Sequence, residues 1–166
     1  MDKKHFSQSV DSVRCAILTV SDSRTPETDG SGRTIRELLL AGGHKVHSYE
    51  IVPDNRDQIR RLVTELSGQP DCEAVLVTGG TGFAPRDVTV EAVEPLFQRR
   101  IDGFGELFRS LSFQEIGAAA MMSRAVAGVV GTTVVFAMPG STAAVRLATT
   151  RLILPQLGHL VGLIRG

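Results

Sequence analysis

A glycine-rich segment that carries one arginine and one aspartate stands directly after a short apolar run. Residues 78–89 are Thr-Gly-Gly-Thr-Gly-Phe-Ala-Pro-Arg-Asp-Val-Thr, and residues 74–77 are Ala-Val-Leu-Val. An aliphatic run too short for a helix is typical of a buried strand in a parallel sheet. Glycines let a ligand approach bare backbone N–H groups, and ligands bind at the carboxyl ends of such strands. We therefore expect an anion-binding loop here, with Asp87 free to hold a metal ion.

The segment matches neither of the common phosphate-binding motifs. No Gly-Lys-Ser/Thr follows, so it is not a P-loop, and Pro85 stands where the dinucleotide fingerprint needs its third glycine. The structural alternative is a tight strand-to-helix turn in which Arg86 and Asp87 form a surface ion pair, which would contribute little energy.

Three other polar loops follow predicted strands: Ser21-Asp22-Ser23, Pro53-Asp54-Asn55 and Pro139-Gly140-Ser141. If the strands are parallel, these loops share one edge of the sheet with the glycine loop and form one cleft. The cleft would combine three aspartates with helix N-termini, which attract phosphate. Carboxylates beside phosphate sites usually hold Mg²⁺, which needs few protein ligands. This arrangement indicates nucleotide or phosphoryl chemistry.

Each of these residues also has a structural alternative. Asp54 could only cap the next helix, and Ser141 could do the same. Asp22 could form an Asx-turn. Arg124, between two hydrophobic segments, is either a buried ion-pair partner or an anion clamp, and its spacing does not decide between them.

The overall composition excludes several classes of protein. The chain has 166 residues, 42% of them hydrophobic, and 18 basic residues balance 18 acidic ones, so we expect no nucleic-acid partner and no membrane surface. No run of 18 apolar residues marks a transmembrane helix, and no apolar signal core follows the start, which favours a cytoplasmic protein. Cys15 and Cys72 fit reduced, buried thiols, and the histidine spacing supports no metal site.

Strand and helix signals alternate along the chain. Residues 1–12 are polar and predict a loose tail, followed by a single domain over residues 13–166. Helices are expected after a Ser31 cap, after Asp54 or Asn55, after a Thr89 cap, over 104–111, from 112 onward, and after Ser141 or Thr142, with a kink at Pro155. Residues 99–103 resemble a turn. Apolar runs predict strands at 13–20, 44–52, 74–78, 126–130 and 133–138.

The last two predicted strands are separated only by Gly131-Thr132, which indicates a hairpin. The rest of the pattern alternates strand and helix. It predicts an α/β fold, a three-layer α/β/α sandwich whose sheet is mostly parallel with one antiparallel element.

The glycine-rich segment and several other segments closely resemble the signature of the molybdenum cofactor biosynthesis protein B family. That family includes molybdopterin adenylyltransferases and the G domains of gephyrin-like proteins. The strongest match is residues 78–92, and the likeness covers nearly the whole chain. The other matching segments are 16–22, 31–34, 52–55, 103–108, 122–128 and 136–141.

The resemblance implies transfer of AMP from Mg-ATP to the terminal phosphate of molybdopterin, release of pyrophosphate, and hand-over to a molybdate-inserting protein. It assigns the catalytic and metal-binding roles to Asp54 and Asp87. A phosphate monoester has a second pKa near 6, so the acceptor needs no strong general base, in keeping with a site built from acids. The candidate substrate-binding residues are Ser21, Asp22, Gly79, Gly80, Thr81, Gly82, Arg86, Ser123, Pro139, Gly140 and Ser141.

Two alternatives to an enzyme remain open. The domain could be a non-catalytic module that binds and delivers molybdopterin, or, less favoured, a general nucleotide-binding protein. An apolar segment over residues 104–113 predicts an oligomer, because large exposed apolar patches usually mark interfaces. The resemblance implies a homotrimer, sometimes paired into a hexamer.

Overall fold

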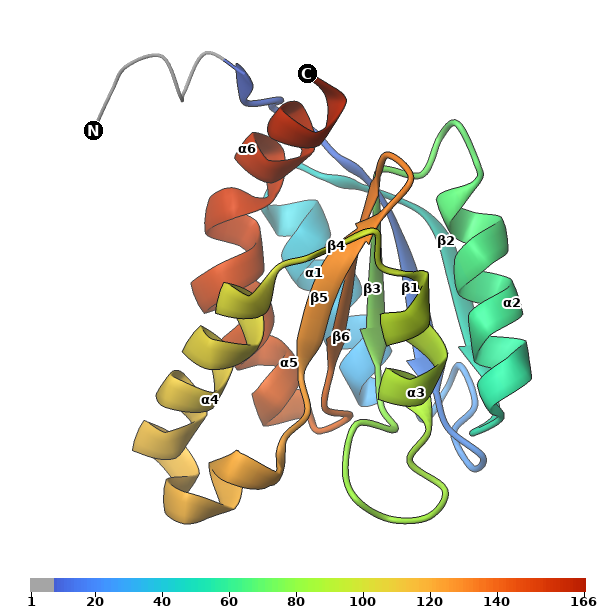
Figure 1. The fold of residues 1–166 in the computed structure, drawn as a ribbon, viewed down its shortest axis with the longest axis vertical. Helices are drawn as coiled ribbons and strands as arrows, with labels where there is room; N and C mark the ends of the chain where they lie inside the picture. Colours follow the sequence, from blue (N-terminus) through green and yellow to red (C-terminus); the bar gives the residue numbers. More distant parts are fainter. Residues whose placement is uncertain (1–7) are drawn as a thin grey trace.

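Six strands form one sheet in the computed structural model, which describes residues 8–166 (Figure 1). They are β1 (Arg14–Val20), β2 (Lys45–Val52), β3 (Ala74–Thr78), β4 (Arg99–Arg100), β5 (Val126–Val130) and β6 (Thr133–Met138). The order across the sheet is β2-β1-β3-β6-β5-β4. The pairs β1–β2, β1–β3 and β3–β6 are parallel, whereas β5 runs antiparallel to both β6 and β4. The predicted sheet, mostly parallel with one antiparallel element, is confirmed.

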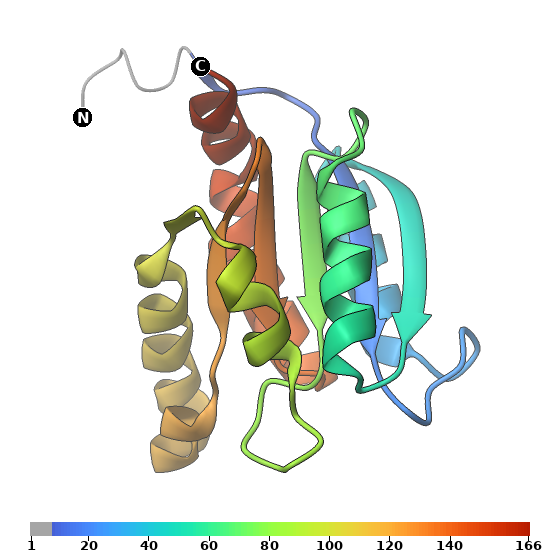
Figure 2. The same cartoon turned by 45° about the vertical axis from the view of Figure 1, so that its right-hand side comes forward.

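Helices cover both faces of the sheet, as Figures 1 and 2 show. They are α1 (Gly30–Ala41), α2 (Arg56–Ser67), α3 (Thr89–Val93), α4 (Asp102–Ile116), α5 (Thr142–Ala148) and α6 (Leu154–Arg165). Side chains alternate between the faces of a strand, so β1 sends Ile17 into the core shared with α1, α4, α5 and α6, and Leu18 into the core shared with α2 and α3. The predicted three-layer sandwich is therefore confirmed.

Two predicted helix caps are wrong. The cap of α1 is Asp29, whose side chain accepts a hydrogen bond from the amide of Gly32, and Ser31 lies inside the first turn. Thr89 is the first residue of α3 and makes no capping bond. Of the alternatives left open elsewhere, Asn55 caps α2 and Ser141 caps α5, each by accepting from the amide three residues on.

The segment around residues 99–116 also differs from the prediction. Residues 99–103 are not a turn, because Arg99 and Arg100 form β4 and α4 begins at Asp102. No new helix starts at residue 112, since α4 continues unbroken to Ile116, and a 3₁₀ segment (Gly117–Met122) follows.

The chain closes with one long helical segment, Thr142–Arg165, in which a π-helical stretch (Thr149–Ile153) precedes Pro155. Its length and composition would allow it to cross a membrane. One side of it, however, is packed on the sheet within the hydrophobic core, where Val145, Ile153 and Leu157 are buried. Packing on the sheet therefore accounts for part of its apolar character.

The N-terminal segment meets this same helix. The amide of Val10 donates to the carbonyl of Gly158 at 3.1 Å, so residues near Val10 lie against α6. Residues 1–7 of the predicted tail lie outside the described residues.

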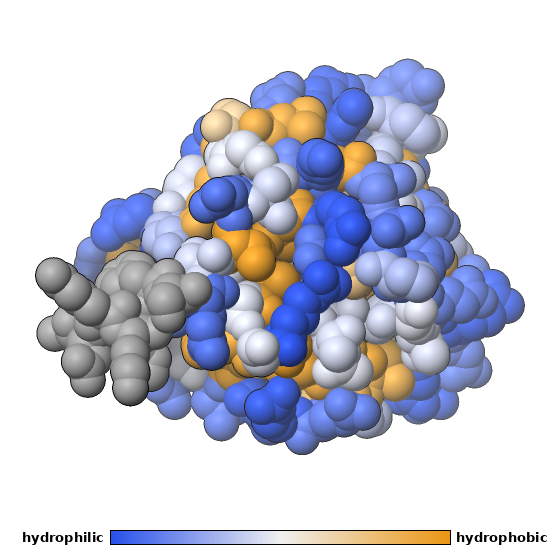
Figure 3. Space-filling view, turned by 90° about the horizontal axis from the view of Figure 1, so that it is seen from above, coloured by the Kyte–Doolittle hydropathy of each residue, from blue (hydrophilic) through white to orange (hydrophobic). Residues whose placement is uncertain are grey.

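The two ends of the sheet differ in character. The four mutually parallel strands β1, β2, β3 and β6 point their carboxyl ends toward the lower end of the view in Figure 1. The upper end, seen in Figure 3, shows a hydrophobic strip bordered by hydrophilic surface. All four polar loops singled out in the sequence lie at the lower end, where they follow these strands.

Candidate functional site

Two adjoining pockets lie at the carboxyl ends of the parallel strands. The first, of about 300 Å³, is the acidic pocket, and the second, of about 280 Å³, is the hydroxyl pocket. They share Val20, Ser21 and Arg24 and so form one continuous cleft. The acidic pocket is completed by Asp22, Ser23, Asp54, Gly80, Arg86 and Asp87. The hydroxyl pocket is completed by Thr19, Asp29, Ser31, Thr78, Gly79, Gly140 and Ser141.

The acidic pocket brings together carboxylates from three separate loops. Asp22 Oδ1 accepts a hydrogen bond from the amide of Asp54 at 2.8 Å, so Asp22 links the loop after β1 to the loop after β2. Asp87 Oδ2 accepts from the amide of Ala84 at 2.9 Å, which fixes its orientation within the glycine loop. Because Asn55 caps α2, the carboxylate of Asp54 is not needed as a cap and remains available to the pocket.

The charge in this pocket is incompletely compensated. Burial raises the pKa of the Asp54 carboxyl, and the negative charges of Asp22 and Asp87 raise it further, although Arg86 opposes them. Carboxylates held together in this way fit a divalent cation, because a cation removes their mutual repulsion. Among residues 8–166 no three acidic, histidine or cysteine side chains form a metal site by themselves.

The glycine loop has a backbone shape that requires glycine at two positions. Gly79 and Gly80 have φ values of 99° and 69°, a region that other residues rarely adopt. Thr89 holds the loop closed, because its hydroxyl donates to the carbonyl of Gly79 at 2.7 Å and its amide donates to Gly80 at 3.0 Å. The loop is therefore a rigid bridge between β3 and α3 that brings Gly80 and Asp87 to the acidic pocket.

Arg124 fastens this loop from outside. Its guanidinium donates to the carbonyls of Thr81, Gly82 and Asp87 at 2.7–3.3 Å, and it also pairs with the carboxylate of Glu91. The ring of Phe83 lies 5.1 Å from the guanidinium carbon, within cation–π range. Of the two roles left open by its spacing, an ion pair is present, although it is partly exposed rather than buried. Its guanidinium holds the loop rather than lining either pocket.

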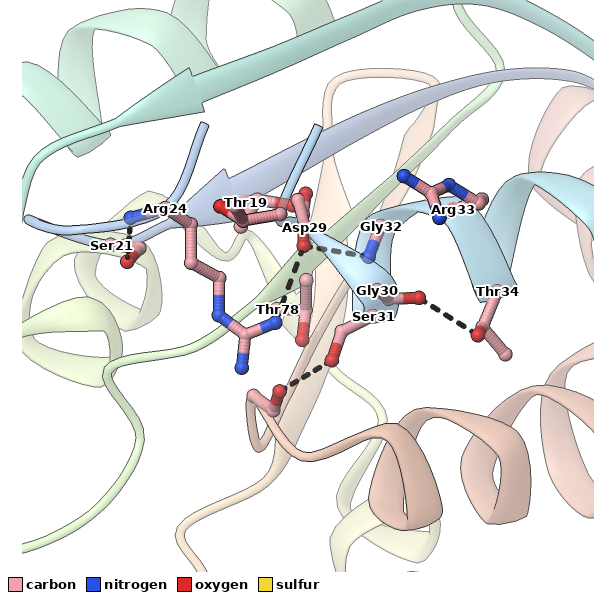
Figure 4. Close-up of polar contacts among 12 residues, drawn as sticks. Thr19, Ser21, Arg24, Asp29, Gly30, Ser31, Gly32, Arg33, Thr34 and Thr78 are labelled. Atoms are coloured by element: carbon pink, nitrogen blue, oxygen red, sulfur yellow. Dashed lines mark hydrogen bonds and ion pairs between the residues drawn. The ribbon is translucent and has the colours of Figure 1, made fainter. Parts of the chain in front are cut away.

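In the hydroxyl pocket, side-chain hydrogen bonds join the first turn of α1 and the end of β3 to the loop after β6. The hydroxyl of Ser31 donates to the carbonyl of Gly140 at 2.6 Å, and the hydroxyl of Thr78 donates to that of Pro139 at 3.0 Å. Figure 4 shows Arg24 extending toward Asp29 beside Thr78 and Ser31. The pocket is neutral apart from Arg24 and the buried Asp29, and its polar groups suit a ligand rich in hydrogen-bonding atoms.

The structure places most of the predicted site residues around this cleft. Thr81, Gly82, Ser123 and Pro139 line neither pocket; the Ser123 hydroxyl is buried without a hydrogen-bond partner within residues 8–166. Sequence reasoning missed the part played by Arg24 and Asp29, although both lie in the polar loop after the first strand, which was the available signal. The predicted residues that line the cleft are Ser21, Asp22, Asp54, Gly79, Gly80, Arg86, Asp87, Gly140 and Ser141.

The predicted cysteine chemistry agrees with the structure. Cys15 and Cys72 are buried and unpaired, and burial raises the pKa of both thiols, that of Cys72 to about 11. The raised pKa keeps both thiols protonated at neutral pH, which makes them poor nucleophiles.

Comparison with known proteins identifies the family to which the chain belongs. Residues 16–159 match the family described as "Probable molybdopterin binding domain". The chain is 52% identical over 158 residues to molybdenum cofactor biosynthesis protein B of Bacillus cereus, covering 95% of this chain and 94% of that protein. The match therefore extends over nearly the full length of both proteins.

Solved structures give the same result. A crystal structure of a molybdenum cofactor biosynthesis protein B matches with a TM-score of 0.91 and 53% identity over 93% of this chain and 96% of the other. The tungsten cofactor synthesizing protein MoaB from Pyrococcus furiosus matches with a TM-score of 0.84 and 32% identity, over 95% and 100% of the two chains. The chain belongs to the molybdenum cofactor biosynthesis protein B family, and its role lies in molybdenum cofactor biosynthesis.

Proposed function

We propose that the protein transfers AMP from Mg-ATP to the terminal phosphate of molybdopterin. The observation that carries this proposal is the junction of the two pockets, where a site with three carboxylates meets a site lined by hydroxyls and backbone groups. Family membership supports molybdopterin as one substrate. The uncompensated charge around Asp54 supports a bound cation, and with it a nucleotide, as the other.

The reaction must bring two anions together. An oxygen of the terminal phosphate of molybdopterin would form a bond to the α-phosphorus of ATP. The bond from that phosphorus to the oxygen shared with the β-phosphate would break, and pyrophosphate would leave with the electron pair. The attacking oxygen is largely ionised at neutral pH, since the second pKa of a phosphate monoester is about 6. The site therefore needs positioning and charge compensation rather than a strong base.

Asp54 and Asp87 are the residues that would hold Mg²⁺. A bound Mg²⁺ supplies the positive charge that offsets the charge on the reacting phosphate groups. Asp22 would keep Asp54 in place through the amide that it accepts from, and Arg86 would add positive charge at the rim of the acidic pocket. The glycine loop would contribute bare backbone next to the bound phosphate.

We further propose that the active form is a homotrimer, or a hexamer of two trimers, located in the cytoplasm. Five large apolar side chains on α4 and the 3₁₀ segment are 53–77% exposed, which is the kind of patch that interfaces cover. Light scattering at micromolar concentration should give a multiple of 17.8 kDa, and a single monomeric species would contradict this part of the proposal. The five side chains are Leu107, Phe113, Ile116, Met121 and Met122.

The adenylylated product would pass to a molybdate-inserting protein.

The test is a pyrophosphate-release assay with purified protein, ATP and molybdopterin. We expect release that requires both Mg²⁺ and molybdopterin and that stops when a chelator is added. Molybdopterin binding without any release, under conditions in which an authentic adenylyltransferase is active, would instead favour a non-catalytic delivery module. Vigorous ATP hydrolysis without the pterin would show that molybdopterin is not the acceptor.

A further inference from the structure

Arg24 occupies the boundary between the two pockets and lines both of them. Its amide donates to the hydroxyl of Ser21 at 3.1 Å, which fixes the loop from which the side chain extends. Its guanidinium is 37% exposed and pairs with Asp29 Oδ1 at 3.7 Å. A guanidinium carries five N–H donors, so most of the donors of Arg24 remain available to a ligand in the cleft.

Asp29 is fully buried and anchors this guanidinium. Its Oδ2 accepts from the hydroxyl of Thr19 at 2.6 Å and from the hydroxyl of Tyr49, while its Oδ1 accepts from the amide of Gly32 at 3.0 Å. These partners belong to β1, β2 and α1, so three elements hold the carboxylate rigidly in one place. Burial alone would raise the pKa of Asp29, but the hydrogen bonds and the charge of Arg24 lower it. Asp29 therefore stays ionised and keeps Arg24 at the boundary.

The surroundings of Arg24 favour an anion that fills both pockets. The hydroxyl pocket contributes no other positive side chain, and the acidic pocket contributes Arg86 against three carboxylates. A phosphate group at the boundary would meet Arg24 on one side and a cation held by the carboxylates on the other. Arginine suits this position because its planar fork matches phosphate oxygens in a bidentate manner.

We propose that Arg24, positioned by Asp29, binds a phosphate group of the substrate. That substrate extends from the hydroxyl pocket into the acidic pocket. The proposal rests on the function proposed above, because it assigns a role to a residue of that same cleft. The phosphate could belong to the pterin acceptor or to the nucleotide, and the experiment below separates the two sources.

The experiment measures binding of inorganic pyrophosphate and of phenyl phosphate, a simple monoester, by calorimetry in the presence of Mg²⁺. Arg24→Gln should weaken binding of at least one probe by about tenfold or more, because a hydrogen bond to a charged group is lost. Arg24→Lys should recover part of the affinity, since it restores the charge without the fork. Loss confined to pyrophosphate assigns Arg24 to the nucleotide, and loss confined to phenyl phosphate assigns it to the acceptor.

Two further variants separate positioning from general charge effects. Tyr49→Phe removes one hydrogen bond to Asp29 without touching the cleft and should weaken the affected probe about threefold, less than Arg24→Gln does. Arg36→Gln makes the same charge change on α1 outside both pockets and should leave binding unchanged. Thermal unfolding of each variant shows that the fold is retained.

The proposal is overturned if Arg24→Gln binds both probes as the unsubstituted protein does, or if the unsubstituted protein binds neither probe. Failure of the proposed function looks different. In that case pyrophosphate is never released from ATP and molybdopterin, while phosphate binding still depends on Arg24.

Discussion

Asp29 and Asp54 are two carboxylates on opposite sides of one cleft, and their surroundings shift their pKa values in opposite directions. Asp29 is buried, accepts hydrogen bonds from Thr19, Tyr49 and Gly32, and has a lowered pKa. Asp54 is half-buried and has a raised pKa, because burial and the charges of neighbouring aspartates are only partly offset by Arg86. The first charge is compensated within the chain, whereas the second is compensated only in part.

Under the proposed function, this difference would separate a positioning role for Asp29 from a catalytic role for Asp54. A carboxylate whose oxygens are already occupied contributes to the fold and to the placement of Arg24. A carboxylate that is crowded by like charges is relieved by protonation or by a bound cation, and the proposed function assigns Asp54 the cation. Substitution at the two positions should therefore affect different measurements.

The largest effect is expected in the acidic pocket. Asp87→Asn keeps the shape of the side chain but removes its charge, and AMP transfer should fall by at least ~10²-fold, as when one well-placed electrostatic contributor to a transition state is lost. Asp54→Asn should act similarly, and the double variant should be little worse than either single one, because residues that act as a unit are not additive. Pyrophosphate release measures the effect.

A matched control is available in the same pocket. Asp22→Asn retains an oxygen that can accept from the amide of Asp54, so it should lose less activity than either of the other two. Near-normal transfer by Asp87→Asn would disprove the proposed metal site and favour the non-catalytic module.

On the other side of the cleft, the expected loss is in stability. Asp29→Ala removes the cap of α1 and leaves the donors of Thr19, Tyr49 and Gly32 without their partner. Each effect costs about 1 kcal/mol or more, and the free energy of unfolding should fall by about 2–4 kcal/mol. Urea denaturation measures it. Asp29→Asn, which still caps, should lose less; equal losses would mean that the charge matters more than the cap.

A smaller effect is expected from Arg124, which holds the loop that carries Asp87. Arg124→Gln should lower transfer by about tenfold through misplacement of Asp87 and should increase amide exchange in residues 80–88. Glu91→Gln removes only the partly exposed ion pair and leaves the contacts with the carbonyls, so it should cost less than about 1 kcal/mol of stability. If both variants exchange equally fast, the ion pair rather than the carbonyl contacts fixes the loop.

The smallest effect has the opposite sign. Asp54→Asn should increase the free energy of unfolding at neutral pH by less than about 1 kcal/mol, because a crowded charge is removed. The gain should appear as a higher midpoint of thermal unfolding. Since the folded-state pKa of Asp54 is raised, the ionised form costs stability at high pH, and this cost disappears as pH falls through that pKa. The difference between the variant and the unsubstituted protein should therefore close in acid.

Magnesium provides the corresponding check. Added Mg²⁺ should stabilise the unsubstituted protein by mass action but should have little effect on Asp54→Asn. Equal stabilisation of both proteins by Mg²⁺ would contradict binding at Asp54.

The parts of the fold that follow from local pattern could be predicted from the sequence. The continuous aliphatic run before Gly79 and the helical spacing of Ile59, Val63 and Leu66 are each visible in a short stretch of sequence. The cleft followed from the rule that the carboxyl ends of parallel strands meet. β4 could not be predicted in this way, because two arginines show no strand pattern and pair with β5 only through the tertiary fold.

The positioning roles of Asp29 and Arg124 could not be predicted from the sequence for a related reason. Asp29 and Ser31 are both good caps by type, and what distinguishes Asp29 is its contact with Thr19 and Tyr49 on two strands. Arg124 likewise bonds to carbonyl oxygens, which every residue carries and which no sequence pattern marks. Such contacts depend on where the fold brings the backbone.

The short strand β4 has a consequence for how copies of this protein meet. A sheet edge exposes unpaired N–H and C=O groups on which a strand of another molecule can add. This edge presents only Arg99 and Arg100, both charged and exposed, and Arg100 is held by ion pairs to Glu94 and Asp102. Like charges would face each other if two such edges came together. The β4 edge is therefore a poor place for a strand of another molecule to add, which favours assembly through the helices on this side of the sheet.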